Sequence, residues 1–220
     1  MKLLISFLMI FQMICTNVEF YGKSYIVYDS LNQYVVEGRN IDYLQSVASI
    51  SKIMTAIVVI ENSRLDKKIT VDETINKAYG SCVYIHIKDQ ITIQDLLYGL
   101  MLRSGNDCAL MLAKSVGGSV ERFVEMMNEK ARDIGMKQTH FSNPSGLDEG
   151  NLSTVKEMAI LYRYCCQNPL FNQIVKTKEY KRLDGKGYWH NKNRLLKEYP
   201  YCVGGKTGYT KKAKRTLITR

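Results

Sequence analysis

The stretch "VASISKIMTA", residues 47–56, contains Ser49 and, three positions later, Lys52. Apolar residues follow at the spacing of one helix face, which predicts a helix from Ser49 to about Asn62 or Ser63. Residues three apart on a helix share a face, so Ser49 and Lys52 would lie side by side. Two interpretations are open: a serine nucleophile beside a lysine that takes its proton, or a serine that caps an ordinary helix.

The nucleophile interpretation carries a chemical condition. A lysine amine accepts the proton of a neighbouring hydroxyl only if burial or a second cation lowers the pKa of the lysine. Spacing alone does not decide, because Ser153 and Lys156 repeat the pattern, and there Ser153 is interpreted as a helix N-cap. Further motifs must therefore discriminate between the two interpretations.

The remaining chain shows strand patterns at both ends and helix patterns between them. Residues 24–30 and 33–39 alternate and predict a β-hairpin, and residues 202–220 predict two strands joined by a basic turn. This order predicts an α+β fold in which helices flank an antiparallel sheet whose edges come from both chain ends. The helices between the strands are expected at 92–104 with Thr92 as N-cap, 106–117, 119–135 with Ser119 as N-cap, and 153–167.

The composition fits one globular domain with a basic surface. The chain has 220 residues, of which 45% are hydrophobic and 24% charged. Its net charge of +10 suits nucleic acid, anionic lipid or an anionic wall polymer, or else a solvated basic surface with no specific partner. The tyrosines form no recognisable RNA-binding motif, so nucleic acid is not expected.

The N-terminus indicates export. Lys2 precedes an apolar run from Leu3 to Cys15, which predicts a signal peptide over residues 1–20 and a folded domain over 23–220. The run is shorter than the roughly 20 apolar residues of a membrane-spanning helix, and a buried N-terminal helix is the alternative. The six cysteines form no CxxC pair and no zinc-like cluster with histidine, so scattered thiols and no metal site are expected.

Two later motifs favour the interpretation of Ser49 as a nucleophile. "RSGND", residues 103–107, sets Ser104 and Asn106 between two helical patterns, either as polar groups in a cleft or as a helix break with an asparagine cap. "GGKTGYT", residues 204–210, sets Lys206 and Thr207 on a strand beside glycines that allow close approach of a substrate backbone. A basic turn is the alternative for this second motif.

In this order the three motifs match the Ser-x-x-Lys, Ser-x-Asn and Lys-Thr-Gly set of the penicillin-binding and serine β-lactamase group. The sequence resembles the serine D-alanyl-D-alanine carboxypeptidases, the low-molecular-weight penicillin-binding proteins, from about Lys23 to Lys212. The resemblance extends to four longer blocks, "ASISKIMTA", "ITIQDLLYGLMLRSGNDCALMLA", "FSNPSGLDEGNLST" and "VGGKTGYT". It implies the β-lactamase and transpeptidase-like fold and a location outside the bacterial membrane, at its extracellular face or in the cell wall.

The resemblance also implies a role for each motif residue. Ser49 would form an acyl-enzyme after Lys52 takes its proton. The reaction would trim the terminal D-alanine from peptidoglycan stem peptides without metal or cofactor, and β-lactams would acylate Ser49 as substrate mimics. The other implied roles are Ser104 and Asn106 for proton relay and substrate orientation, Lys206 and Thr207 for the substrate carboxylate, Gly208 for the substrate-binding strand, and the N–H groups of Ser49 and Tyr209 for the oxyanion hole.

Two departures from the family pattern bear on these expectations. Asn151 stands where relatives commonly have histidine, which is interpreted as local drift. Relatives also continue past the position of Arg220 with a strand between the two terminal hairpins and a closing helix. We therefore expect a sheet that lacks an inner strand and has unpaired edges.

Three functions thus stay in view. The favoured one is a serine D-Ala-D-Ala carboxypeptidase. A serine β-lactamase would use the same chemistry with a glutamate that activates the deacylating water, and no glutamate is convincingly placed for this. The third is an inactive, truncated remnant that binds wall material, which the intact motifs oppose.

Overall fold

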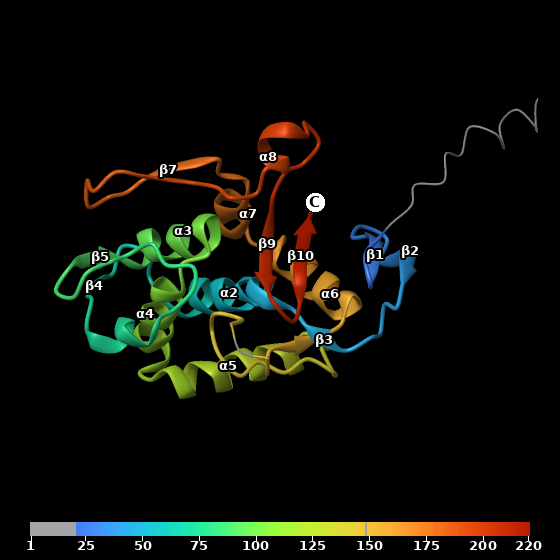
Figure 1. Cartoon of the computed structure of the whole chain (residues 1–220), viewed down its shortest axis with the longest axis horizontal. Helices are drawn as coiled ribbons and strands as arrows, with labels where there is room; N and C mark the ends of the chain where they lie inside the picture. Colours follow the sequence, from blue (N-terminus) through green and yellow to red (C-terminus); the bar gives the residue numbers. More distant parts are fainter. Residues whose placement is uncertain (1–20, 148) are drawn as a thin grey trace, which may run out of the picture.

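The computed structural model describes residues 21–147 and 149–220 (Figure 1). More of the described residues lie in helices than in strands, and the strands are short and pair antiparallel, so the α+β prediction is confirmed. The predicted signal peptide, residues 1–20, lies outside the described residues. Within the described ranges, no helix is long and apolar enough to cross a membrane.

One helix, α2 (Lys52–Asn62), occupies the middle of the fold. Its residues Lys52 to Val59 are all buried, and it contacts α3, α4, α5, α6 and α7. A helix that is apolar on all sides can sit only in such a position. The short 3-10 helix η1 (Ala48–Ser51) precedes it, so the predicted α-helix begins at Lys52 and the turn that carries Ser49 is wound more tightly than expected.

The surrounding helices are α3 (Ile93–Arg103), α4 (Asn106–Gly117), α5 (Val120–Asp133) and α6 (Val155–Cys165). Thr92 and Ser119 accept from the backbone N–H groups of Asp95 and Arg122 at 3.0 Å, which confirms both predicted N-caps. The prediction for α6 was wrong by one residue. Thr154 caps this helix through Glu157 N–H at 3.0 Å, whereas Ser153 ends a strand.

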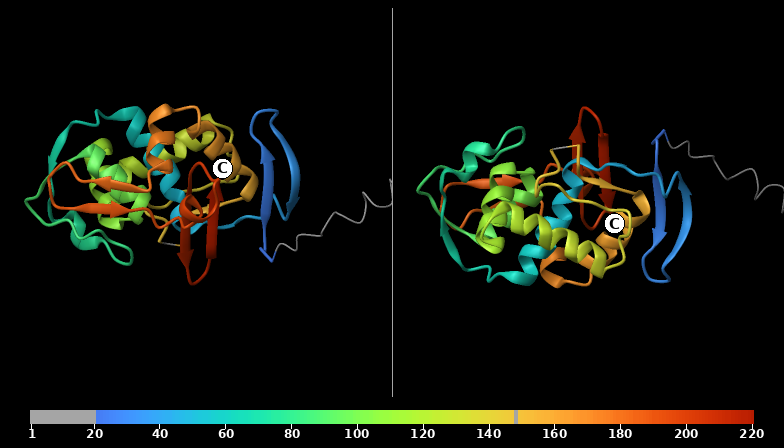
Figure 2. Two further views of the ribbon diagram at one scale, coloured as in Figure 1. Left: turned by 90° about the horizontal axis from the view of Figure 1, so that it is seen from above. Right: turned by 90° about the horizontal axis from the view of Figure 1, so that it is seen from below.

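The terminal segments form two hairpins, as predicted. β1 (Tyr25–Asp29) pairs with β2 (Tyr34–Arg39), and β9 (Gly205–Thr210) pairs with β10 (Lys214–Thr219). The expected single sheet is not formed by the described residues, because each hairpin is a separate two-stranded sheet. Both β1 and β10 contact α6, and Figure 2 shows the β1–β2 hairpin at one end of the molecule, apart from β9–β10. Among the described residues, no strand therefore joins the two hairpins into one sheet.

Several short elements escaped the sequence patterns, which need longer windows to be recognised. The strands among them fix the loops around the helices, because β3 pairs with β6, β4 with β5, and β7 with β8. Their bounds are β3 (Gln45–Ser46), β4 (Lys68–Thr70), η2 (Glu73–Lys77), β5 (Gln90–Thr92), β6 (Leu152–Ser153), α7 (Pro169–Lys176), β7 (Glu179–Lys181), β8 (Tyr188–His190) and α8 (Leu195–Glu198).

The β9–β10 hairpin is seated directly on the turn that carries Ser49. Thr216 Oγ1 donates to the Val47 carbonyl oxygen at 3.2 Å. A Cβ atom at Gly208 would lie 2.9 Å from the backbone nitrogen of Ser49, which is closer than real Cβ atoms approach. Only a residue without a side chain lets β9 pass this close to η1.

The loop before β6 also depends on a close approach to η1. Gly146 has φ +76°, and a Cβ there would lie 2.0 Å from the Ala48 carbonyl oxygen and 2.3 Å from Ser51 Oγ. Gly185 has the same φ of +76° with no atom within 4 Å of the corresponding position. Substituting alanine at Gly185 therefore measures the energetic cost of the backbone conformation alone, and substituting it at Gly146 adds the cost of the close contact.

We expect Gly185→Ala to lower the free energy of unfolding by about 1–2 kcal/mol, the cost of a left-handed backbone. Gly146→Ala should cost about 1–3 kcal/mol more, because the added methyl must displace the Ala48 backbone. Urea unfolding of the two variants measures the difference. Equal losses of stability in the two variants would show that the loop around Gly146 does not hold η1 as the structure indicates.

Candidate active site

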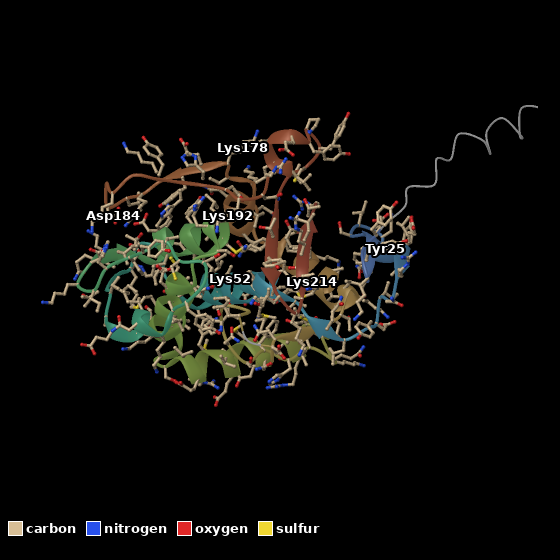
Figure 3. All side chains as sticks on the ribbon, in the orientation of Figure 1. Tyr25, Lys52, Lys178, Asp184, Lys192 and Lys214 are labelled. Atoms are coloured by element: carbon tan, nitrogen blue, oxygen red, sulfur yellow. The ribbon has the colours of Figure 1, made fainter. Side chains whose placement is uncertain are left out.

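The amine of Lys52 is completely buried and meets three oxygen atoms. Its Nζ lies 3.1 Å from Ser49 Oγ and 2.7 Å from Asn106 Oδ1, and it also donates to the Ser145 carbonyl oxygen. Figure 3 shows Lys52 among the side chains in the middle of the molecule, where α2 begins. The spatial neighbourhood of Ser49 and Lys52 that the sequence predicted is confirmed.

These three partners suit the amine in both protonation states: a charged lysine donates to all three oxygens, and a neutral one donates to two of them. The Asn106 amide oxygen and the Ser145 carbonyl oxygen can only accept, and they take the two hydrogens of an uncharged lysine. The lone pair of the nitrogen then faces Ser49, whose hydroxyl is able to donate. Burial lowers the pKa of Lys52 well below its usual value, and the charge of Lys206 lowers it further. The pKa of Lys52 is therefore shifted in the direction that the nucleophile interpretation requires.

Ser49 lies on a strained turn. Ala48 immediately before it has φ +50° although it is not glycine, and it is fully buried. A backbone in this region costs energy and persists only where its surroundings hold it, here by the contact with Gly146 and by β9. Ser49 itself is 8% exposed, so it is largely enclosed by these neighbours.

The turn between α3 and α4 supplies the second wall. Ser104 ends α3 in the left-handed conformation, with φ 65°, and Asn106 begins α4. Asn106 Nδ2 donates to the Tyr79 carbonyl oxygen at 2.6 Å, which fixes the orientation of the amide and turns Oδ1 toward Lys52. Both side chains thus enter the site rather than merely breaking a helix.

A second buried lysine faces this wall from β9. Lys206 is 2% exposed, and its Nζ donates at 2.7 Å to Ser104 Oγ and to the Thr207 carbonyl oxygen. Burial lowers the pKa of Lys206 to about 7, and the positive charge of Lys192 contributes. Lys192, which the sequence analysis did not single out, therefore acts on the site through its charge.

The 141–151 loop holds the Ser145 carbonyl that accepts from Lys52, and it was recognised from sequence only as turn-rich. Asn143 Oδ1 accepts from the N–H groups of Ser145 and Gly146 at 3.0 and 2.7 Å. Asn151 is fully buried, accepts from the N–H groups of Ser142 and Asn143, and donates to the Asn143 carbonyl oxygen. Asn151 is thus more than local drift, because it holds the loop that presents the Ser145 carbonyl.

The structure therefore assembles the predicted residues into two hydrogen-bonded groups. Ser49, Lys52 and Asn106 form one, and Ser104 and Lys206 form the other, with the charges of the two lysines acting on each other. Thr207 and Gly208 line a groove of about 320 Å³ between β9–β10 and residues 192–195, and neither hydrogen-bonded group of the site lines it. The Tyr209 side chain is 62% exposed, and no contact between it and Ser49 or Lys52 is recorded among the described residues. Within these residues no cluster of three or more histidine, cysteine or acidic side chains could hold a metal ion.

Comparison with known proteins agrees with this geometry. The chain is 33% identical over 205 residues to D-alanyl-D-alanine carboxypeptidase DacF of Bacillus subtilis, which covers 89% of the chain but 53% of that protein. It is also 33% identical over 202 residues to D-alanyl-D-alanine carboxypeptidase DacB2 of Mycobacterium tuberculosis, covering 90% of the chain and 69% of that protein. The chain therefore spans between about half and two thirds of the length of these relatives.

A solved structure shares the fold. The crystal structure of a D-alanyl-D-alanine carboxypeptidase from Mycobacterium tuberculosis H37Rv superposes with a TM-score of 0.86 at 31% identity, covering 93% of this chain and 80% of the other. A family model described as D-alanyl-D-alanine carboxypeptidase matches residues 12–220. With the Ser49–Lys52–Asn106 cluster in place, these matches show that the chain belongs to the D-alanyl-D-alanine carboxypeptidase family.

Proposed function

We propose that the protein is a serine peptidase that removes the terminal D-alanine from peptidoglycan stem peptides through an acyl-enzyme on Ser49. The observation that carries this proposal is the contact between the buried Lys52 amine and Ser49 Oγ, together with the burial that lowers the pKa of Lys52. In its neutral form Lys52 has two acceptors for its two hydrogens and can turn its lone pair to the Ser49 hydroxyl. This is the arrangement that a serine nucleophile with a lysine base requires.

Acylation uses both groups of the site. Ser49 Oγ attacks the carbonyl carbon of the final peptide bond while Lys52 Nζ takes the hydroxyl proton. An ester bond to Ser49 forms, the C–N bond breaks, and the departing amine of D-alanine takes up a proton. The Ser104 hydroxyl accepts from Lys206 Nζ, so its own hydrogen is free to point toward that amine.

Charge develops on the carbonyl oxygen during this step. We assign its stabilisation to the backbone N–H groups of Ser49 and Tyr209, and the close passage of β9 beside the Ser49 nitrogen supports this. Water then cleaves the ester, with Lys52 as the base for the attacking molecule. Thr207 and Lys206 are the proposed contacts for the substrate carboxylate. None of these steps needs a cofactor.

The β-lactamase alternative finds no support in the site. That chemistry, as set out from the sequence, calls for a glutamate that activates the deacylating water. Among the described residues, no glutamate hydrogen-bonds to Ser49, Lys52, Ser104 or Asn106. Glu149 on the 141–151 loop pairs instead with Lys212 and is largely exposed. A β-lactam is therefore proposed to acylate Ser49 and to remain bound as an inhibitor.

The basic charge suggests where the protein works. Residues 191–220 contain nine lysines and arginines, all but the buried Lys206 outside the site's hydrogen bonds, and a single acidic residue, Glu198. They form α8, β9 and β10, which lie together on one side of the molecule in Figure 1. We propose that the exported protein is held at anionic wall polymers or at the membrane surface through these elements.

Labelling by fluorescent penicillin tests the nucleophile. The native chain should show a covalent band, and Ser49→Ala should abolish it. Ser51→Ala is the matched control, since Ser51 is also buried in η1 but its Oγ has no hydrogen-bond partner. Equal labelling of Ser49→Ala and native protein would refute the assignment, and a folded native chain without any label would favour an inactive wall-binding protein.

The coupling of the two lysines predicts a shift in pH dependence. Lys52 is a base only when neutral, so acylation rises with pH through the pKa of Lys52. The Lys206 charge lowers that pKa, and Lys206 is charged below about pH 7. Lys206→Gln should therefore move the rising limb of the acylation rate to higher pH. Stopped-flow acylation between pH 5 and 9 measures it, and a limb that stays in place or moves down would contradict the coupling.

Adsorption to isolated cell walls tests the proposed location. Binding through Lys and Arg is screened by salt, because the Debye length falls from about 10 Å at 0.1 M to about 3 Å at 1 M. The protein should therefore elute as salt is raised over this range. Retention that is indifferent to salt would contradict an electrostatic attachment.

A further inference from the structure

The segment 78–86 borders the site without being part of any helix or strand. It packs against the start of α4, since a Cβ at Gly80 would lie 3.4 Å from Asn106 Nδ2 and 3.4 Å from the Leu147 side chain. Two of its carbonyl groups accept from Asn106, Tyr79 from the side chain at 2.6 Å and Ser81 from the backbone N–H at 2.8 Å. The orientation of Asn106, and hence of its contact with Lys52, depends on where this segment lies.

A single buried carboxylate holds the segment from its other end. Asp107 is 3% exposed, and its oxygens accept from the backbone N–H groups of Val83 at 3.1 Å, Tyr84 at 2.8 Å and Ile85 at 3.3 Å. Asp107 Oδ1 also accepts from the Cys108 N–H at 2.9 Å. Among the described residues no lysine or arginine forms a salt bridge with it. The backbone donors of this segment are therefore its recorded partners, and hydrogen bonds to a charged acceptor are stronger than neutral ones.

Asp107 and Asn106 are adjacent, so the two ends of the segment are anchored to one turn of one helix. The path runs from the Asp107 carboxylate through the 79–85 backbone to the Asn106 amide, and from Asn106 Oδ1 to Lys52 Nζ at 2.7 Å. If the carboxylate were lost, Tyr79 and Ser81 would be free to move away. The Asn106 side-chain amide would then lose the Tyr79 carbonyl that fixes its rotation, and Lys52 would lose a fixed partner for one hydrogen.

We propose that Asp107 is a positioning residue for the reaction: it clamps residues 79–85 against Asn106 so that Lys52 presents its lone pair to Ser49. This rests on the proposed function, because it is the acylation of Ser49 that the clamp serves. Asp107 itself touches neither the nucleophile nor the base.

The isosteric change Asp107→Asn is a sharp test. An amide of the same shape keeps one accepting oxygen, but its NH₂ group would face N–H donors that have no acceptor left. We expect the rate constant for acylation at saturating penicillin to fall roughly 10- to 100-fold, the loss that small misplacements of catalytic groups cause. The half-saturating penicillin concentration should change less than the rate constant, because Asp107 itself contacts neither the ligand nor the nucleophile.

Asp95→Asn is the matched control. Asp95 is also fully buried, lies in the first turn of α3, and accepts from the Leu183 N–H at 2.9 Å and from the Tyr180 hydroxyl at 2.9 Å. It holds a loop that does not touch Asn106 or Lys52. Asp95→Asn should therefore lose stability in urea as Asp107→Asn does, but should acylate at the native rate at temperatures below unfolding.

Hydrogen exchange of the Asn106 backbone N–H, measured by NMR, tests the clamp without any measurement of activity. This N–H donates to Ser81, so it should exchange faster in Asp107→Asn and unchanged in Asp95→Asn. Two results would overturn the clamp but leave the proposed function standing, provided that the native chain is labelled. One is an equal acylation rate constant in Asp107→Asn and Asp95→Asn. The other is a change in Asp107→Asn that affects only the half-saturating penicillin concentration. If the native folded chain is not labelled, the proposed function fails. In that case hydrogen exchange still tests the clamp: an Asn106 backbone N–H that exchanges no faster in Asp107→Asn than in the native chain would refute it.

Discussion

The burial of one amine, Lys52, is the constraint on which the rest of the site depends. A charged lysine in the core would lose its hydration, so the fold favours the neutral form. A neutral amine still needs partners for two hydrogens and a lone pair, and unpaired polar groups in the interior are costly. The chain meets this need with Asn106 from α4, the Ser145 carbonyl from the 141–151 loop, and Ser49 from η1. The arrangement that gives the buried Lys52 its hydrogen-bond partners is thus the same one that places Ser49 beside its base.

Amide side chains bring these three segments together. An asparagine donates and accepts at once, so each one ties two stretches of backbone to each other. Asn106 joins Lys52 to the Tyr79 carbonyl, and Asn151 joins the end of the 141–151 loop to the backbone of Ser142 and Asn143 near its start. None of these connections is part of a helix or sheet. The site is therefore rigid although its walls are irregular, since each loop is fixed at its ends by a buried polar group.

The sequence predicted the parts of this structure that side chains determine locally. Thr92 and Ser119 were recognised as N-caps because a hydroxyl before a helical pattern bonds the next turn. Ser153 was chosen wrongly over Thr154 because both can cap, and the pairing of Ser153 with Gln45 in β3–β6 decides which residue begins the helix. That pairing joins residues more than a hundred positions apart, and no local pattern records it.

For the site, motif resemblance placed Ser49, Lys52, Ser104, Asn106 and Lys206 together correctly, whereas the Ser145 carbonyl was missed. A backbone carbonyl is present at every residue, so composition carries no indication of which one a lysine will meet. The same reason hides the N–H groups of Val83, Tyr84 and Ile85 that surround Asp107. Lys192 was missed because its effect is a charge acting at a distance rather than a contact.

Two buried lysines in one cleft have a consequence for proton movement. Each positive charge opposes the other, so the cleft does not favour protonation of Lys52 and Lys206 at the same time. When Lys52 takes the Ser49 proton in the proposed reaction, its new charge lowers the proton affinity of Lys206. Lys206 already donates to Ser104 Oγ, so a proton pushed from Lys206 has a route toward the leaving amine through that hydroxyl. The repulsion that makes Lys52 a base thereby also favours delivery of a proton on the opposite wall.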